Sequence, residues 1–410
     1  MIQRDRLLDR FLRYVRVGSA ADPQSSTCPS STGQLVLGKL LAEELIAMGA
    51  SDVEQDCHGL VWAMINPASS SARAVLLNAH VDTSPEAPGD GCNPQVVKCY
   101  QGGPIPLENG LTIDPAESPE LNDLIGHTII TTDGRTLLGG DDKAGVAVIM
   151  EVAQALLENP NPNAAPLRVL FTCDEEIGAG TKYLDVAKVN ACVGYTLDGG
   201  GAGTIDVETF SADMAIVRFQ GRNTHPSVGK GKMINSLRAL GAFLAELPHE
   251  TLSPETTAER QGFIHPYHVS GGVQNSEVHL ILRDFQTAQL AVYAELLREI
   301  ANMIEKRNVG IKASVEIKEQ YRNMGDVLSG FPLAADLAEQ AFKKLGRPCR
   351  RDIIRGGTDG ALMSAMGLPT PNLSVGQYNI HSVREYASLE QMVEAAEHAL
   401  CLLELWGNVE

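Results

Sequence analysis

Four short apolar runs, each leading to an acidic or histidine side chain, constrain the fold of this chain more than any other feature. They are residues 74–79 before His80, residues 167–173 before Asp174, residues 193–197 before Asp198, and residues 372–375 before the loop that carries His381. Short aliphatic runs of this kind are typical of buried strands. Because ligands bind outside the carboxyl ends of the strands in an open α/β sheet, we expect these side chains to meet at one sheet edge.

Stretches with helical periodicity alternate with these strands at residues 35–48, 146–157 and 389–405. The alternation predicts an α/β fold, in which helices flank a mainly parallel mixed sheet. Between about residues 212 and 319 the pattern changes to β-α-β-β-α-β, which is the order of a ferredoxin-like α+β unit. The expected elements there are strands at 214–219, 263–273, 277–285 and 311–317, and helices at 233–247 and 288–306.

A unit of this length is large enough to be a domain inserted into another one. We therefore expect a discontinuous domain at residues 1–211 and 320–410, and an inserted domain at residues 212–319. The composition agrees with a globular protein: of 410 residues, 44% are hydrophobic and 20% are charged, so the chain can bury a sizeable core. The formal net charge is -18 and no basic stripe is visible, which argues against nucleic acid as a partner.

The remaining composition signals indicate a cytoplasmic protein. The apolar residues between Leu7 and Val15 have the spacing of an amphipathic helix rather than that of a signal peptide core. No apolar stretch approaches the length of a membrane span. The eight cysteines form no Cys-x-x-Cys pair, which favours free thiols in a reducing compartment. We therefore expect a cytoplasmic location and no membrane partner.

His80 and Asp82 lie on the same side of an extended chain, because side chains alternate along a strand. Asp82 can therefore accept the proton on one ring nitrogen of His80 while the other ring nitrogen binds a metal ion. The alternative interpretation is a buried histidine whose acidic partner serves stability alone.

Asp141 follows a glycine turn, Gly139-Gly140, which we expect to lead from a strand at residues 137–138 into a helix. A carboxylate at such a point offers two oxygens and can bridge two cations. The alternative is an ordinary helix N-cap, in which the aspartate accepts backbone N–H groups at the positive end of the helix dipole.

Asp174, Glu175 and Glu176 form an acidic run directly after an expected buried strand. Three neighbouring carboxylates repel one another, so ionising all of them is unfavourable unless positive charge lies nearby. Metal ions would supply that charge, and a solvated acidic loop is the alternative. The glycines after Asp198 do not indicate a phosphate site, because a strand at residues 204–208 follows them where a helix would be needed.

Four motifs together carry a family resemblance. They are His80-Val81-Asp82-Thr83, Gly140-Asp141-Asp142-Lys143-Ala144-Gly145, Asp174-Glu175-Glu176 and Arg355-Gly356-Gly357-Thr358-Asp359-Gly360. In this order the motifs resemble those of the zinc-dependent exopeptidases that include carboxypeptidase G and succinyl-diaminopimelate desuccinylase, and most of all those of the tripeptide aminopeptidases. The resemblance runs from Leu7 to the final helix.

The resemblance implies a two-zinc centre in the discontinuous domain. His80, Asp141 and Asp198 would hold one zinc ion, and Asp141, Glu176 and His381 would hold the other, with Co²⁺ or Mn²⁺ as possible substitutes. Asp82 would orient His80, and Glu175 would be the general base beside a bridging hydroxide. The implied reaction is the release of the N-terminal residue from a tripeptide.

Residues outside the metal centre would bind the substrate, a small peptide. His225, in Asn223-Thr224-His225-Pro226-Ser227, resembles the family histidine that donates to the oxyanion, in dimeric members from the neighbouring subunit. Bracing of the turn before Pro226 is the alternative. Arg283 and Arg355 are candidates for binding the peptide carboxylate, because guanidinium groups bind carboxylates bidentately, and surface ion pairs are the alternative. The inserted domain would act as a lid, and a homodimer through it is a further expectation.

Two other functions stay open on the sequence alone. A metal-dependent dipeptidase, or an amidohydrolase acting on N-acyl amino acids, would need the same metal centre and would differ only in its substrate pocket. A non-catalytic binding protein on the same fold would have lost the base or a ligand, yet Glu175 and every ligand position of the family are present.

Overall fold

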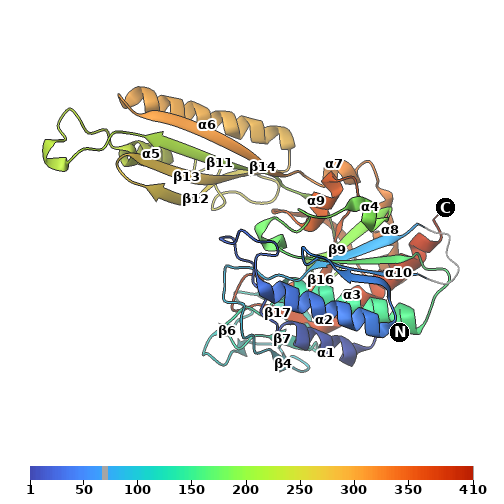
Figure 1. Ribbon diagram of the computed structural model, residues 1–410. Helices are drawn as coiled ribbons and strands as arrows, with labels where there is room; N and C mark the ends of the chain where they lie inside the picture. Colours follow the sequence, from blue (N-terminus) through green and yellow to red (C-terminus); the bar gives the residue numbers. More distant parts are fainter. Residues whose placement is uncertain (67–72, 410) are drawn as a thin grey trace. The chain divides into compact units, whose positions relative to one another are not determined.

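The computed structural model describes residues 1–66 and 73–409 of the chain. Two compact units make up the fold (Figure 1). The first unit comprises Met1–Val207, Met324–Ile353 and Thr358–Glu410, and the second comprises Glu208–Asn323 and Ile354–Gly357. The expected inserted domain, residues 212–319, lies within the second unit, which also takes in a later segment that the sequence did not indicate.

A large mixed sheet forms the centre of the first unit. Its strands lie in the order β1 (Ser51–Gln55), β2 (Val61–Ile65), β8 (Leu167–Thr172), β3 (Val75–His80), β9 (Val193–Gly200), β16 (Asn372–Tyr378), β17 (Tyr386–Ser388), β7 (Ile129–Thr131) and β4 (Gln95–Val97), and β10 (Thr204–Thr209) and β15 (Arg350–Ile354) extend it beside β16. The neighbours β8, β3, β9 and β16 are parallel, whereas β2 and β17 pair with them antiparallel. This confirms the predicted mixed α/β sheet, and it brings the carboxyl ends of the four apolar runs together.

Helices pack on this sheet and on one another. The helices of the first unit are α1 (Arg4–Tyr14), α2 (Thr32–Met48), α3 (Gly140–Glu158), α4 (Val186–Val189), α7 (Gly325–Leu328), α8 (Leu333–Lys344), α9 (Asp359–Ala365) and α10 (Leu389–Gly407), with 3₁₀ turns η1 (Pro119–Leu124) and η2 (Glu175–Ile177) and a small hairpin of β5 (Ile105–Pro106) and β6 (Thr112–Ile113). The central helix α3 contacts β3, β9 and β16 and also α1 and α10, so almost all of its residues are buried. Within the described part of the chain, no helix has both the length and the apolar composition needed to cross a membrane.

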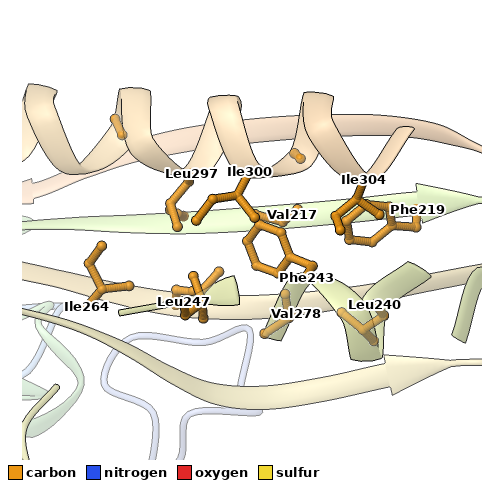
Figure 2. Packing of buried hydrophobic residues seen from close by; sticks show 14 of the residues in the cluster. Val217, Phe219, Leu240, Phe243, Leu247, Ile264, Val278, Leu297, Ile300 and Ile304 are labelled. Atoms are coloured by element: carbon orange, nitrogen blue, oxygen red, sulfur yellow. The ribbon is translucent and has the colours of Figure 1, made fainter. Parts of the chain in front are cut away.

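The second unit is a four-stranded antiparallel sheet with two long helices. Its strands lie in the order β12 (Phe263–Gly271), β13 (Asn275–Asp284), β11 (Ser211–Gln220) and β14 (Lys312–Tyr321), and α5 (Ser236–Glu246), α6 (Thr287–Arg307) and the 3₁₀ turn η3 (Pro226–Val228) complete it. The strands and long helices thus follow the expected β-α-β-β-α-β order. Figure 2 shows Leu297, Ile300 and Ile304 of α6 pointing towards Val217 and Phe219 of β11, where they form the core of this unit.

Two local expectations differ from the structure. Residues 137–138 lie in a loop rather than in a strand, because the N–H of Leu137 donates to the carbonyl of Pro88, which lies outside the sheet. The helix expected from residue 233 begins at Ser236, because the side chain of Asn235 accepts the N–H of Leu237 and caps the helix there.

Candidate metal centre

Two triads of possible metal ligands share one residue in the first unit. Ligand atoms of His80, Asp141 and Asp198 lie within 4.8 Å of one another, and so do those of Asp141, Glu176 and His381. One carboxylate oxygen of Asp141 is 3.0 Å from Nε2 of His80, and its other oxygen is 3.3 Å from Nε2 of His381. Asp141 therefore faces both histidines, one with each oxygen, as a bridging carboxylate would.

Parallel strands and the turns after them place these five side chains. His80 is the last residue of β3, and Asp198 lies near the end of the neighbouring strand β9. Glu176 lies in η2, which follows β8, and His381 lies in the loop between β16 and β17. Asp141 precedes the regular turns of α3, since its backbone angles are not helical. The parallel order of the four strands therefore brings residues that are far apart in sequence to one edge.

The residues present fit a pair of zinc ions, because imidazole nitrogens and carboxylate oxygens are ordinary zinc ligands. Oε1 of Glu176 is buried and has no hydrogen-bond partner among the described residues, so it is a polar atom in need of one. Burial and the charge of Asp141 raise the pKa of Asp198 to about 6. Burial also raises the pKa of Glu176 to about 7, despite its hydrogen bond to His381. Nearby cations would stabilise these carboxylates in their charged form.

The pKa values of the two histidines are raised as well, which for a base favours the charged form. Burial alone would lower the pKa of His381, but hydrogen bonds to Asp141 and Glu176 raise it to about 11. The pKa of His80 is also raised well above its ordinary value, because hydrogen bonds to Asp141, Asp198 and Asp82 outweigh the effect of its burial. Since a metal ion binds only the deprotonated nitrogen, metal binding here is expected to release protons.

Asp82 holds both His80 and the acidic turn. Its carboxylate is fully buried, with Oδ1 3.4 Å from Nδ1 of His80, and its backbone carbonyl lies closer to the same nitrogen, at 3.1 Å. The same carboxylate accepts the backbone N–H of Glu175 at 3.1 Å and that of Glu176 at 3.0 Å. Asp82 thus contacts the imidazole on the side away from Asp141 and fixes the turn that carries two further acids.

The three consecutive acids have separate surroundings. Asp174 does not point into the metal centre, because its carboxylate accepts hydrogen bonds from Ser30 and from Nε2 of Gln34 at 2.6 Å. Glu175 lies beside the first triad, with Oε2 4.0 Å from Nε2 of His80, and burial raises its pKa well above the ordinary value. Only Glu176 belongs to a triad. The run is therefore not a solvated acidic loop. Asp174 is separated from the two glutamates, so the three carboxylates do not all repel one another at one site.

The helix-cap alternative for Asp141 applies to its neighbours instead. Asp142 accepts the N–H of Gly145 at 3.1 Å and, with its other oxygen, the N–H of His80 at 3.3 Å. The carboxylate of Glu385 accepts the N–H groups of Gly139 at 2.7 Å and Asp141 at 3.0 Å. These two carboxylates satisfy the start of α3, which leaves both oxygens of Asp141 to face the histidines.

Several residues that touch the triads were missed on the sequence. Oε2 of Glu86 lies 3.1 Å from Nδ1 of His381, and Gln377 donates to Oδ1 of Asp198 at 3.2 Å. Glu385 is the third such residue. The only signal in the sequence was position, since Glu86 follows Asp82 within a few residues and Glu385 follows His381 in the same way. Their partners are distant along the chain, so spacing alone could not identify the contacts.

The three predicted substrate-binding residues all belong to the second unit. His225 is exposed, and its Nδ1 accepts the N–H of Ser227 at 3.3 Å. Arg283 donates to Gln320 at 2.8 Å and stacks over the ring of Tyr321. Arg355 donates instead to the carbonyls of residues 257, 259 and 261, and lies over two phenylalanine rings. The structure therefore gives the two arginines different partners and does not pair them.

Comparison with known proteins places this chain among the peptidases. The model of peptidase family M20/M25/M40 matches residues 130–405. The chain is 42% identical over 405 residues to peptidase T of Geobacillus kaustophilus, which covers 98% of each protein. A tripeptidase structure from Staphylococcus aureus has a TM-score of 0.78 at 22% identity, with 100% of both chains covered. A dinuclear metal-binding peptidase of the M20 family from Bacillus subtilis has a TM-score of 0.65 at 16% identity, with 98% of both chains covered.

Proposed function

Because this chain belongs to peptidase family M20/M25/M40, we propose that it is a two-metal aminopeptidase that releases the N-terminal residue from tripeptides. The observation that carries the proposal is the pair of ligand triads that share Asp141. The similarity to peptidase T over nearly the whole chain supports a peptidase activity, and the motifs that resemble those of tripeptide aminopeptidases support the tripeptide substrate. We further propose zinc as the metal, with His80, Asp141 and Asp198 around one ion and Asp141, Glu176 and His381 around the other.

The chain's own residues then divide the work of peptide hydrolysis. Two zinc ions, when bound, lower the pKa of water and polarise the scissile carbonyl. Glu175 lies beside the first triad without belonging to it, so its carboxylate is available to take a proton from the attacking water. The same carboxyl group then passes the proton to the leaving amine. Asp82 keeps His80 and the turn of Glu175 in place throughout.

His225 is proposed as the donor to the oxyanion. Its Nδ1 lies 2.7 Å from Oγ of Ser227, which can donate to it, and 3.3 Å from the N–H of the same residue, and both contacts fit the neutral tautomer that carries its proton on Nε2. Nε2 is therefore the donor, which is what an oxyanion requires. The contact with Ser227 also means that His225 braces its own turn, so the two interpretations of this histidine are compatible.

Arg283 is the stronger of the two candidates for the peptide carboxylate. Burial lowers the pKa of Arg283, which indicates a partly desolvated guanidinium. The guanidinium of Arg355 already donates to three backbone carbonyls, so we propose that Arg355 mainly holds the loop of residues 257–261. A homodimer through the second unit is also part of the proposal, and sedimentation velocity of the full chain tests it.

Hydrolysis of a matched peptide set tests the proposed function. The set contains a dipeptide, a tripeptide, a tetrapeptide and an N-acetyl tripeptide of the same sequence, each incubated with zinc-loaded protein. We expect cleavage of the tripeptide with release of its N-terminal residue, and no cleavage of the acetylated peptide. The Glu175→Gln variant is the control against contaminating peptidases. Preferred cleavage of the dipeptide would favour a dipeptidase, and efficient cleavage of the acetylated peptide would favour an amidohydrolase.

A further inference from the structure

We propose that Glu385 is a positioning residue of the metal centre, which holds the backbone of Asp141 and ties it to the loop that carries His381. The inference rests on the two-metal centre proposed above, and it assigns a role to a residue that lies outside both ligand triads. Glu385 is buried in the first unit, with only 1% of its surface exposed. A glutamate that is almost completely buried needs partners for its carboxylate oxygens.

Both oxygens of Glu385 find those partners at the start of α3. Oε2 accepts the N–H of Gly139 at 2.7 Å, and Oε1 accepts the N–H of Asp141 at 3.0 Å. The first N–H groups of a helix have no partner within the helix, and a negative charge is favoured at this end. A side chain on Gly140 would place its Cβ 3.0 Å from Oε1, so glycine leaves the space that the carboxylate occupies. The segment of residues 139–141 thus offers two free N–H groups and the space at Gly140 that the carboxylate of Glu385 needs.

Glu385 also connects two ligands that no strand holds. His80, in β3, pairs with Thr172 of the neighbouring strand β8, and the backbone N–H of Asp198, in β9, donates to the side chain of Asn372 in β16 at 3.1 Å, so both ligands are held within the sheet. Asp141 and His381, in contrast, lie outside the strands and the regular part of a helix. Glu385 follows His381 in the same loop and forms its two bonds across more than two hundred residues of sequence to the segment of Asp141. These two hydrogen bonds therefore connect the backbone of Asp141 to the loop of His381, which no strand pairing does.

The two metal positions are expected to depend on Glu385 to different degrees. At the metal position formed by Asp141, Glu176 and His381, Glu385 supports two of the three ligands, Asp141 and His381. The position of His80, Asp141 and Asp198 relies on it for one ligand, and the other two are held by the sheet. Loss of Glu385 should therefore weaken the first of these positions more than the second.

Metal titration of metal-free protein tests this asymmetry. Co²⁺ is added to the wild type, to Glu385→Gln and to Glu385→Ala, and binding is followed by visible absorption and by competition with Zn²⁺. A His381→Ala variant identifies the binding phase that belongs to the position of His381. We expect both Glu385 variants to weaken that phase by about 10–100-fold, the usual effect of losing a residue that supports a metal ligand, and to change the other phase less.

Glu390→Gln is the matched control. Glu390 is also a glutamate that accepts a backbone N–H, that of Thr128 at 2.6 Å, but it has no contact with either triad among the described residues. We expect this variant to leave both phases unchanged, even where its thermal midpoint falls as much as that of Glu385→Gln. If Glu385→Ala does not fold, Glu385→Gln decides alone.

Equal weakening of both phases, or no weakening of either, in Glu385→Gln would overturn the role of Glu385. A wild type that binds fewer than two ions would instead overturn the two-metal proposal itself, whatever the variants do. The two failures are therefore distinguishable in a single set of titrations.

Discussion

Glu175 and Glu176 are neighbours in sequence, yet their carboxylates have different surroundings. Glu176 lies 3.0 Å from Nε2 of His381 within a triad, whereas Glu175 lies 4.0 Å from Nε2 of His80 and belongs to neither triad. The 3₁₀ turn that Asp82 fixes separates the two side chains. A ligand and a proton carrier can thus be adjacent in the chain without competing for the same cation.

The first prediction separates these two roles. Asp141→Asn should lower metal content at both positions, because Asp141 faces both histidines. Glu175→Gln should keep both ions and lower kcat by about 10²–10⁴, the typical contribution of a general base. Metal analysis and kcat of the two purified variants are the measurements. Full metal content in Asp141→Asn, together with metal loss in Glu175→Gln, would reverse the assignment.

The second prediction concerns His225. His225→Ala should lower kcat by about 10²–10³, as for the loss of one donor to an oxyanion, with metal content unchanged. His268→Ala is the control, because His268 is another exposed histidine of the second unit. A normal kcat in His225→Ala would show that this residue does not donate to the oxyanion and only stabilises its turn through Ser227.

Among the elements of the first unit, α1 and α3 are joined by a buried ion cluster. Glu151 of α3 is fully buried and accepts hydrogen bonds from Arg6 and Arg10 of α1, each at 2.7 Å. It also accepts the N–H of Gln3 at 2.8 Å, directly before α1 begins. Because charged groups are costly to bury alone, the cluster determines where α1 can pack.

The third prediction tests this cluster. Glu151→Ala leaves the buried charge of Arg10 with a longer ion pair to Glu44 at 3.5 Å and a neutral partner, Gln154, so the free energy of unfolding should fall by about 3 kcal/mol. Glu158→Ala is the control, because Glu158 pairs with Arg6 at the exposed end of α3, where an ion pair contributes little. Urea unfolding of both variants measures the difference. Equal effects in the two variants would contradict a special role for the buried pair.

The fourth prediction concerns pH and the packing of α10 on α8. His398 of α10 is buried, stacks on Phe342 of α8 and bonds to the carbonyl of Ala338 at 2.9 Å. Burial lowers its pKa to about 4, the bond to Ala338 opposes this shift, and the charge of Arg347 adds to it. The folded protein therefore keeps His398 neutral at a pH where the unfolded chain, with an ordinary pKa near 6.5, already binds a proton.

The contribution of His398 to stability is complete above pH 6.5 and is lost as the pH falls from 6.5 towards 4. Between pH 7 and pH 5 this single group should lower the free energy of unfolding by about 2 kcal/mol. Comparison with His398→Gln isolates the effect, because other groups titrate equally in both proteins. The same pH dependence in the wild type and in His398→Gln would rule out this histidine as its source.

For the whole molecule, selection of tripeptides requires that both ends of the substrate are sensed. A site that bound only the free amine would accept any longer peptide. The fifth prediction is therefore that tripeptide amides are poor substrates, since an unpaired, desolvated guanidinium costs on the order of 2–5 kcal/mol. Arg283→Ala should narrow the difference in kcat/KM between acid and amide. Arg298→Ala is the control, because Arg298 is an exposed arginine of α6 that pairs with Glu295. An equal effect in this variant would contradict the role of Arg283 in binding the peptide carboxylate.

The class of fold, and the sheet edge where the acidic and histidine side chains meet, could be predicted because both depend on local patterns. The assignment of particular side chains as metal ligands or as the base came from the family resemblance. Apolar runs such as residues 74–79 and 167–173 specify strands wherever they lie, and the rule that ligands collect at strand ends needs no contact information. The structure indeed brings His80, Asp141, Glu176, Asp198 and His381 together. The expected strand at residues 137–138 is absent because the N–H of Leu137 bonds to Pro88, a distant contact that local patterns do not specify.

The sequence by itself determined which elements form and which side chains stand at their ends, because periodicity and turn chemistry act over a few residues. Only the tertiary structure decided the partners of those side chains. In the folded protein, Asp174 accepts hydrogen bonds from Ser30 and Gln34. Arg355 donates to backbone carbonyls, and Glu385 accepts the N–H groups around Asp141. The physical reason is that a buried carboxylate or guanidinium takes whatever donor or acceptor the packing places beside it, and that neighbour is specified by the whole fold rather than by adjacent sequence.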